Sequence, residues 1–454
     1  MIGFAFTNGP LYFSMPGTVA TATDKRIAAG ENSYAYWQGS YDFMSSVGFA
    51  YDSEGRTYGV AAGGDINATQ ADRFSLMTDR WDISGAATGG SYAGSNALRL
   101  EAIAQYGDSN RANTGTLNFD KNRVKSPSIV TSRKNTTDST NIYMAYFDDL
   151  NEEIRFRYGN LADSQTTKAN FNNYNDAYRN NTINNNDNLD KGKYDLSYCQ
   201  VIADSTGTAT LGQAGEYVCI DVVSSNNKDV VVLVWYDSHS GDLKYAYNTN
   251  PTAGTTGKNT TNWTGVKTIF TGSGEYCQLV ADAKGGIHIA GYDSSNGDLK
   301  YAYLSSYDAD YSEDSDSCVV DSYAIIGQNL TIDVVLDSAG GKAIPYIGYY
   351  GLSSTKPKLA YKVSTSVGNG SVDDAYTSNW EVTLVPSSSK IPQDRINVGL
   401  WKDSDGVRKA STKGTSSAGQ YFGKCYGTGK DTPVLGYQIR ESSTSGYIET
   451  AQMK

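Results

Sequence analysis

Acidic side chains gather in one stretch of the chain, between residues 308 and 316. Asp308, Asp310, Asp314 and Asp316 lie there together with Glu313. Calcium prefers carboxylate oxygens as ligands, so the four aspartates are candidate calcium ligands. The stretch lacks the glycine and the terminal bidentate glutamate of an EF-hand loop, so a solvated acidic turn is the favoured interpretation. Calcium is the one cofactor that the sequence suggests.

Two further aspartates, Asp237 and Asp293, each end an apolar run and precede a short polar tip. A ligand-binding carboxylate is one interpretation. The favoured one is an Asx turn, in which the side chain accepts backbone N–H groups where a strand ends. His239 lies at one of these tips and is a candidate ligand-binding residue. The other histidine, His288, lies in an apolar run, and two separated histidines do not favour a metal site or a histidine-based triad.

Aromatic side chains on loops suit carbohydrate binding, because aromatic faces stack on the C–H groups of sugars. Trp37, Tyr174 and Tyr178 are candidate ligand-binding residues together with His239. Tyr174 and Tyr178 lie in the Asn-rich segment of residues 160–193, which is interpreted as a long insert. Long loops on a rigid scaffold often carry binding residues, although a structural role is the favoured interpretation of this one.

Other aromatic and sulfur-containing residues are expected to pack in the interior. Trp263 and Trp380 occupy similar places in TNWTGVKTIF and SNWEVTLV, and this equivalence favours packing over ligand binding. The 5 cysteines are odd in number and form no CxxC, so neither a disulfide framework nor a zinc cluster is indicated. Cys219 and Cys277 lie in apolar runs and are expected to be small buried side chains.

The composition excludes several classes of function. The chain has 38 basic and 49 acidic residues and a formal net charge of −11, which argues against nucleic acid as a partner. No apolar run approaches the ~18–20 residues of a membrane-spanning helix. Gly-rich phosphate loops, GxSxG and HExxH motifs are absent from the sequence. A glycosidase would need paired carboxylates, and the sequence does not single out a pair.

Strands and tight turns must position these residues. The 35 Tyr and 47 Gly, with only 9 Pro, are typical of many short strands and turns. The segment Val230–Tyr247 (VVVLVWYDSHSGDLKYAY) returns as Ile287–Tyr303 (IHIAGYDSSNGDLKYAY). An apolar run, a tip with glycine, and an alternating return strand predict a β-hairpin in both places.

Looser copies of this pattern predict six units of about four strands each. Their first strands are expected at Val47–Asp52, Ser126–Arg133, Tyr217–Ser224, Tyr276–Asp282, Leu330–Asp337 and Ile396–Asp403. Antiparallel repeats of this length indicate a β-propeller, in which each sheet hides its apolar faces against its neighbours. The expected fold is all-β, a six-bladed β-propeller, with seven blades as the second choice. A β-solenoid and a row of β-sandwiches are the rivals.

The last unit lacks a fourth strand. The apolar segment Pro10–Met15 is expected to supply it and to close the ring through an N-terminal strand. Residues 1–454 are then a single β-propeller domain with residues 160–193 as an insert.

The pattern of WYD, a turn, GDLKYAY and a later N-W-x-x-V resembles the repeat propellers at the C-terminal ends of large bacterial cell-surface proteins. More distantly, it is similar to fucose-binding lectin propellers. The resemblance covers the third and fourth units well and implies the fold. The sugar site of those lectins does not map onto positions in this chain, so no binding residue is carried over.

These observations favour a non-catalytic binding or structural module, extracellular or at the cell surface. Its partner would be a glycan or a cell-surface protein. One alternative is a glycoside hydrolase or lyase with its site at the central channel, and another is a self-associating subunit of a surface layer or filament. The N-terminus has no basic region followed by a long apolar one, so we expect either a cytosolic protein or, preferably, a processed or partial chain.

Overall fold

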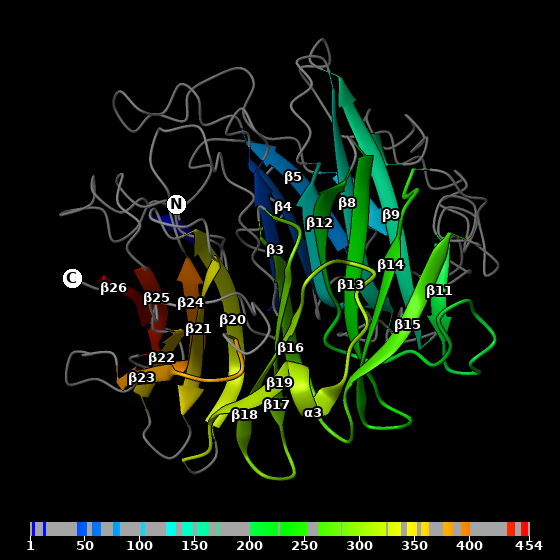
Figure 1. The fold of residues 1–454 in the computed structure, drawn as a ribbon. Helices are drawn as coiled ribbons and strands as arrows, with labels where there is room; N and C mark the ends of the chain where they lie inside the picture. Colours follow the sequence, from blue (N-terminus) through cyan, green and yellow to red (C-terminus); the bar gives the residue numbers. More distant parts are fainter. Residues whose placement is uncertain are drawn as a thin grey trace.

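The structure is a computed structural model (Figure 1). It describes residues 2–4, 12–14, 43–51, 57–64, 76–81, 101–104, 124–132, 139–148, 152–162, 170–171, 200–225, 228–252, 262–282, 284–323, 326–336, 343–351, 356–362, 376–384, 392–399, 434–440 and 446–452.

Antiparallel strands dominate these residues, and they pair into sheets in chain order. We name each sheet after its first strand. The β3 sheet contains β3 (Phe43–Tyr51), β4 (Thr57–Gly64), β5 (Leu76–Trp81) and β6 (Glu101–Ala104). The β7 sheet contains β7 (Val124–Thr131), β8 (Ser139–Asp148), β9 (Glu153–Ala162), β10 (Asn170–Phe171) and β11 (Gln200–Asp204).

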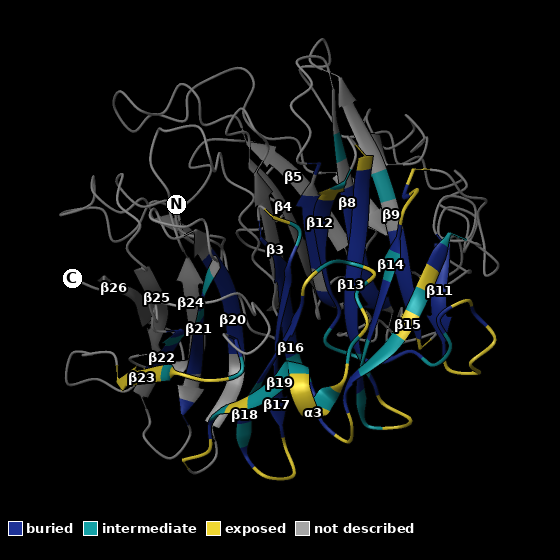
Figure 2. Ribbon diagram, in the orientation of Figure 1, coloured by how far each residue is buried: buried dark blue, intermediate teal, exposed yellow. Residues whose placement is uncertain are grey.

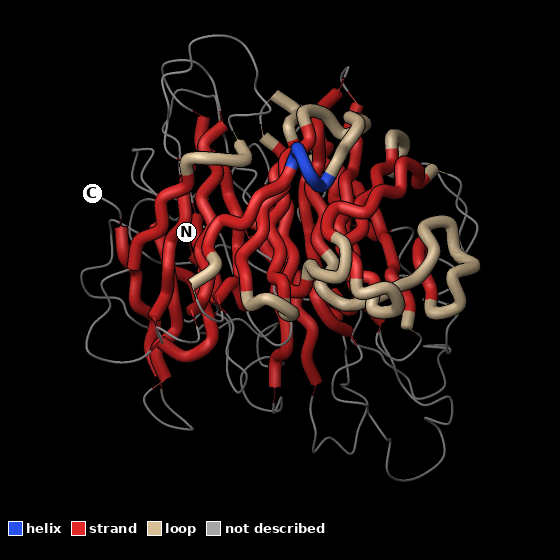
Figure 3. Tube along the Cα trace, turned by 60° about the horizontal axis from the view of Figure 1, so that its bottom comes forward, coloured by secondary structure: helices blue, strands red, loops and turns tan. Residues whose placement is uncertain are grey.

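The next two sheets hold the two copies of the repeated hairpin. The β12 sheet contains β12 (Cys219–Ser225), β13 (Lys228–Asp237), β14 (Asp242–Asn248) and β15 (Trp263–Phe270). The β16 sheet contains β16 (Glu275–Ala281), β17 (Ile287–Asp293), β18 (Asp298–Leu304) and β19 (Ser317–Asp321). A short helix, α3 (Glu313–Asp316), precedes β19 and is the blue segment of Figure 3.

Two further sheets complete the series. The β20 sheet contains β20 (Ile326–Leu336), β21 (Ala343–Gly351), β22 (Lys356–Lys362) and β23 (Trp380–Leu384). The β24 sheet contains β24 (Pro392–Gly399), β25 (Val434–Arg440) and β26 (Gly446–Gln452). The six first strands match the expected positions to within a few residues.

The hairpins follow from their sequence. The apolar run of β13 is buried from Val230 to Trp235, as expected of a strand covered on both faces. Gly241 and Gly297 have φ of 75° and 77° at the two tips, where a side chain would be strained. Asp237 Oδ1 accepts the backbone N–H of His239 and Ser240, and Asp293 Oδ1 accepts those of Ser295 and Asn296. Both aspartates therefore form the expected Asx turns.

The sheets pack face to face around their first strands. Successive first strands β3, β7, β12, β16, β20 and β24 contact one another in that order. One buried apolar cluster joins the β7 and β12 sheets, a second joins the β12 and β16 sheets, and a third joins the β16 and β20 sheets. Figure 2 shows the buried strands β12, β13 and β16 in dark blue, with exposed residues in yellow at the hairpin tips. This arrangement is a β-propeller, and the count of six blades stays a prediction.

Side chains also link the first strands of adjacent sheets. The backbone N–H of Ile220 donates to Ser128 Oγ at 3.0 Å, and the N–H of Leu279 donates to Cys219 Sγ at 3.1 Å. Asp221, 1% exposed, accepts the N–H of Ala281 through Oδ2 at 2.9 Å. Each first strand lies at the edge of its own sheet, and these hydrogen bonds join its backbone N–H groups to side chains of the preceding first strand.

The N-terminal segment pairs differently from the expectation. Strand β2 (Tyr12–Ser14) pairs with β1 (Ile2–Phe4) in a two-stranded sheet of its own, and the β24 sheet has three described strands. The two short strands flank Asn8-Gly9, a common hairpin-turn sequence, and a local pairing closes a much shorter loop than one between the chain ends. The expected pairing of Pro10–Met15 with the last sheet is therefore corrected.

Several expectations lie wholly or largely outside the described residues. In the Asn-rich segment of residues 160–193, only residues 160–162, which end β9, and 170–171, which form β10, are described. Within the part of the chain that the structure describes, no helix is long and apolar enough to cross a membrane.

Candidate binding surface at one end of the sheets

Four tyrosines and two glutamates gather where the β12 and β16 sheets meet. We call Glu216, Tyr217, Tyr236, Glu275, Tyr276 and Tyr292 the junction cluster. The ring centroids of Tyr217 and Tyr276 are 4.8 Å apart, and Tyr217 also meets Tyr236 edge-on at 6.1 Å. Tyr276 meets Tyr292 edge-on at 6.0 Å. The rings form a continuous row from one sheet to the next, beside the hairpin tips.

A repeated backbone bulge presents these tyrosines. Tyr217 and Tyr276 have φ of 63° and 54°, and Ser126 has φ of 49° at the same place in the β7 sheet. In the β7 and β16 sheets the strand register shifts at this point, between Lys125 and Ser128 and between Glu275 and Gln278. A left-handed conformation costs a residue with a side chain about 1–2 kcal/mol. Strain of this kind is often found at functional sites, where surrounding packing maintains it.

Exposure and charge make this cluster suitable for binding. Tyr217, Tyr236, Tyr276, Glu216 and Glu275 are half-buried, so ring edges and carboxylates reach the surface. Burial raises the pKa of Tyr217 and Tyr276 above the ordinary value, and the nearby Glu216 and Glu275 raise it further. The tyrosines are therefore neutral hydroxyl groups beside negative charge over the physiological pH range.

Open space borders the cluster at Gly272. This residue has φ of 61°, and a Cβ placed on it would meet no atom within 4 Å. A Cβ on Gly241 would lie 3.8 Å from the Tyr236 hydroxyl and 3.9 Å from Gly272 Cα, so Gly241 lies between Tyr236 and Gly272. Gly272 is held in place by its N–H, which donates to Asp242 Oδ1 at 2.9 Å.

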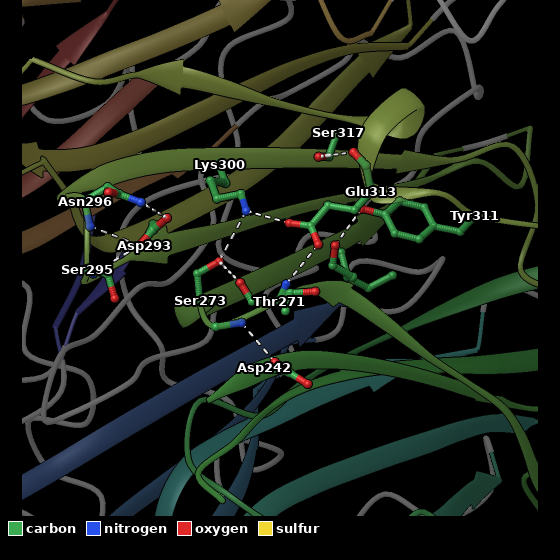
Figure 4. Close-up of polar contacts among 12 residues, drawn as sticks. Asp242, Thr271, Ser273, Asp293, Ser295, Asn296, Lys300, Tyr311, Glu313 and Ser317 are labelled. Atoms are coloured by element: carbon green, nitrogen blue, oxygen red, sulfur yellow. Dashed lines mark hydrogen bonds and ion pairs between the residues drawn. The ribbon is translucent and has the colours of Figure 1, made fainter. Parts of the chain in front are cut away.

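A lysine lies on the outer side of the same junction (Figure 4). Lys300 Nζ forms an ion pair with Glu313 Oε1 at 2.7 Å and donates to Ser273 Oγ at 3.3 Å. The ammonium group also lies 4.6 Å from the centroid of the Phe270 ring. Glu313 Oε2 accepts the backbone N–H of Thr271 at 3.0 Å, so this glutamate connects α3 to the segment that directly follows β15.

Equivalent lysines occupy the neighbouring sheets. Lys244 pairs with Asp242 at 2.7 Å, and Lys358 pairs with Asp321 at 2.8 Å. The repeated GDLKYAY motif contains Lys244 and Lys300, so the sequence held the signal for this position. It did not show the partners, because Glu313 and Asp321 reach their lysines from other strands and loops.

The acidic stretch of residues 308–316 covers the outer edge of the preceding sheet. Lys267 Nζ donates to the backbone oxygen of Ala309, Tyr311 Oη donates to the oxygen of Ile269 at 2.6 Å, and Tyr307 packs edge-on against Tyr247 at 5.0 Å. Asp308 Oδ1 accepts a hydrogen bond from Ser306, and Asp316 Oδ2 accepts the N–H of Ser312.

Asp310 and Asp314 are exposed in this stretch. Among the described residues, no three histidine, cysteine or acidic side chains are arranged to hold a metal ion. The calcium site at Asp308, Asp310, Asp314 and Asp316 stays a prediction.

The other candidate residues have different outcomes. His239 is exposed on the tip that follows Tyr236 and Asp237, next to the junction cluster. Trp37, Tyr174 and Tyr178 lie outside the described residues. Trp263 is 2% exposed and packs edge-on against Phe156 at 5.1 Å, which confirms its expected role in packing. Trp380 packs against Tyr301 at 4.7 Å.

Cys219, Cys277 and His288 lie in the interior. Cys219 and Cys277 are free and buried, as expected. His288 is fully buried, with Nδ1 2.6 Å from Tyr301 Oη and Nε2 3.2 Å from Asp282 Oδ2. A neutral imidazole fits both contacts, because Nε2–H can donate to the carboxylate while Nδ1 accepts from the hydroxyl. No sequence pattern predicted this hydrogen-bonded series of Asp282, His288 and Tyr301.

Comparison with known proteins finds propeller-like structures. No protein-family model matches the chain, and no curated protein matches it. A mutant of Aleuria aurantia lectin in complex with Fucα1-6GlcNAc is similar over 90% of this chain and 95% of that one, with 8% identity and a TM-score of 0.38. The Dos1 propeller is similar over 90% of this chain and 85% of its own, with 9% identity and a TM-score of 0.36.

A glycoside hydrolase family 43 arabinoxylan arabinofuranohydrolase from Bacillus subtilis is also similar, with 11% identity and a TM-score of 0.36. The similarity covers 73% of this chain and 63% of the hydrolase. No site residue is transferred from any of these proteins.

Proposed function

We propose that this chain is a non-catalytic binding module of the extracellular space or cell surface, and that it binds a glycan at the junction cluster. The observation that carries the proposal is the row of four tyrosines, three of them half-buried, beside two carboxylates at the strand ends. Aromatic rings stack on sugar C–H groups, and carboxylates and phenol hydroxyls bond sugar hydroxyls. The chain is proposed to act as one domain over residues 1–454.

A glycan array followed by calorimetric titration tests this proposal. We expect Tyr236→Ala to weaken binding of the best glycan by about tenfold or more, because stacking on an aromatic ring is worth about 0.5–1.5 kcal/mol beyond the area it buries. Gly272→Asn should also weaken binding, since asparagine tolerates positive φ and its side chain would enter the open space.

Tyr361→Ala is the matched control. Tyr361 is also half-buried but stacks on Tyr346 in the β20 sheet, away from the junction cluster. Unchanged binding in Tyr236→Ala and Gly272→Asn, with both variants folded, would contradict the proposed site. An array and titrations without any glycan binding would contradict the function.

The hydrolase alternative has one observation in its favour. Glu216 and Glu275 occupy equivalent places in adjacent sheets, and both act on the same tyrosines. Incubating the protein with the glycans that it binds, and measuring new reducing ends, separates the two functions. Product that disappears in Glu275→Gln would favour hydrolysis.

The alternative of a self-associating surface subunit also has an observation behind it. Apolar side chains on the outer strands are exposed, with Val319 at 51%, Leu384 at 50% and Val382 at 39%. Sedimentation velocity at micromolar concentrations would show association if these residues form a contact between copies.

A further inference from the structure

We infer that the glycan bound at the junction cluster is positively charged, and that its chemical class is an amino sugar in the ammonium form. This inference rests on the proposed function and adds the charge of the ligand. Three observations carry it, namely the local balance of charge, the aromatic and carboxylate groups at the surface, and the hydroxyl and amide groups of the adjoining tip.

Carboxylates outnumber ammonium groups at this end of the β12 and β16 sheets. Among the described residues the acidic groups here are Glu216, Asp237, Asp242, Glu275, Asp293, Asp298, Glu313 and Asp321, and the lysines are Lys244, Lys300 and, from the β20 sheet, Lys358. Each lysine already forms an ion pair, Lys244 with Asp242, Lys300 with Glu313 and Lys358 with Asp321. The excess charge of this surface is therefore negative, as is the formal net charge of the chain, −11.

Neighbouring groups respond to this negative field. Burial raises the pKa of Asp298, and Asp293 and Asp321 raise it further. Burial also raises the pKa of Tyr236, and the negative charges of Glu275, Asp237 and Asp242 raise it further. A bound cation would relieve this repulsion, whereas an anionic glycan would increase it.

The cluster offers both kinds of contact that an ammonium group prefers. Tyr217, Tyr236 and Tyr276 are half-buried, and a cation is attracted to the face of an aromatic ring. Glu275 is half-exposed beside them and accepts a hydrogen bond from Ser294 Oγ at 3.1 Å through one oxygen. A carboxylate beside tyrosine rings fits a protonated amine better than it fits an acetylated one, because the amide carries no charge and cannot form an ion pair.

Polar groups on the adjoining tip favour a sugar as the carrier of this charge. Ser294, Ser295 and Asn296 are exposed on the tip after Tyr292 and can bond ring hydroxyls. Gly272 is exposed nearby, and a Cβ placed on it would meet no atom within 4 Å, so no side chain blocks the approach of a ring there. A lysine-rich peptide would satisfy the carboxylates but would leave these groups without hydroxyl partners.

Calorimetric titration with a glucosamine tetramer and an N-acetylglucosamine tetramer of the same linkage tests the inference. We expect the glucosamine tetramer to bind about tenfold more tightly, and its affinity to fall as salt is added. Glu275→Gln and Glu216→Gln should reduce this preference severalfold while leaving the thermal midpoint unchanged. Asp310→Asn is the control, because it removes the same charge from an exposed position on the outer loop.

Equal affinity for the two tetramers would overturn the inference and leave the glycan-binding function in place. Binding of oligolysine as tight as that of the glucosamine tetramer would also overturn it, since charge alone would then decide. Failure of both tetramers and of every arrayed glycan would instead overturn the proposed function.

Discussion

Single side chains on the first strands connect one sheet to the next. Asp221 is the clearest case, because its carboxylate accepts the N–H of Val222 in its own strand and the N–H of Ala281 in the next one. Asp333 accepts the N–H of Val334 in the same way within the β20 sheet. A short acidic side chain at this place therefore bonds backbone donors of its own strand and, at Asp221, of the next first strand.

Replacing Asp221 tests this role. Asp221→Ala removes a buried side-chain acceptor that two backbone N–H groups use, and we expect it to lower the free energy of unfolding by about 2–4 kcal/mol, since loss of a buried hydrogen-bond partner costs about 1–3 kcal/mol for each bond. Urea denaturation measures the change. Asp221→Asn, which keeps an oxygen acceptor, should lose less, and exposed Asp310→Ala should stay within about 0.5 kcal/mol. An Asp221→Ala variant as stable as the parent would contradict the assigned role.

Residue patterns predicted some local features and missed others. The Asx turns at Asp237 and Asp293 followed from residue type and position, because aspartate is suited to bond the backbone at the end of a strand. The left-handed Tyr217 and Tyr276 did not, since tyrosine has no preference for positive φ and tertiary packing imposes it. This is why the junction cluster was missed, although Gly-Glu-Tyr recurs at residues 215–217 and 274–276, where β12 and β16 begin.

At the scale of elements, the connection before β19 packs against the preceding sheet, the β12 sheet. Residues 307–313 run along β15. They contact Lys267 and Ile269 within this strand and Thr271 directly after it. A similar contact recurs one sheet on, where Tyr376 packs on Tyr303 at a centroid distance of 4.2 Å. Each of these connections covers the outer part of the preceding sheet and limits the edge available for pairing with other chains.

Tyr311→Phe tests this cover. The variant loses the hydrogen bond to the Ile269 oxygen, and we expect a loss of about 1 kcal/mol in stability together with faster amide exchange at Thr271. Hydrogen exchange measured by NMR reports the local effect. Tyr323→Phe is the control, because Tyr323 is 79% exposed. Unchanged exchange at Thr271 would show that the loop does not hold β15.

The strand pattern was predictable at this scale and the loop contacts were not. Alternation, apolar runs and glycine tips gave the first strands and the hairpins, because these signals are local in the sequence. The partners of Lys300 and Lys358 come from other strands and loops, and no local pattern encodes them. The predicted pairing of the N-terminal strand was wrong for a different reason. The missing fourth strand of the last unit suggested a partner at the other end of the chain, whereas the nearby Asn8-Gly9 turn favours a local hairpin.

At the scale of the whole molecule, tyrosine is the commonest of the largest side chains that are fully buried among the described residues. Tyr143, Tyr245, Tyr301 and Tyr349 are fully buried, and burial raises the pKa of each above its ordinary value. The unfolded chain therefore releases these protons at lower pH than the folded one does. Their contribution to stability is complete below pH ~10 and is lost as the pH rises toward the folded-state pKa values.

We expect cooperative unfolding in alkali as a consequence. Absorbance at 295 nm should show exposed tyrosines ionising near pH ~10, with the buried ones ionising only in the step in which circular dichroism reports loss of structure. The chain has 35 tyrosines, so the two phases should be easy to separate. Ionisation of all of them near pH ~10 with the circular dichroism unchanged would contradict their burial.

The backward reach of residues 307–313 sets an order of events during synthesis. Strand β15 leaves the ribosome well before residues 307–313, which cover it. The outer edge of the β12 sheet therefore stays uncovered until much of the β16 sheet has been translated. Maturation of each such sheet therefore trails the growing end of the chain by one repeat. A nascent chain stalled between these two repeats would display a bare strand edge to the chaperones around the exit tunnel.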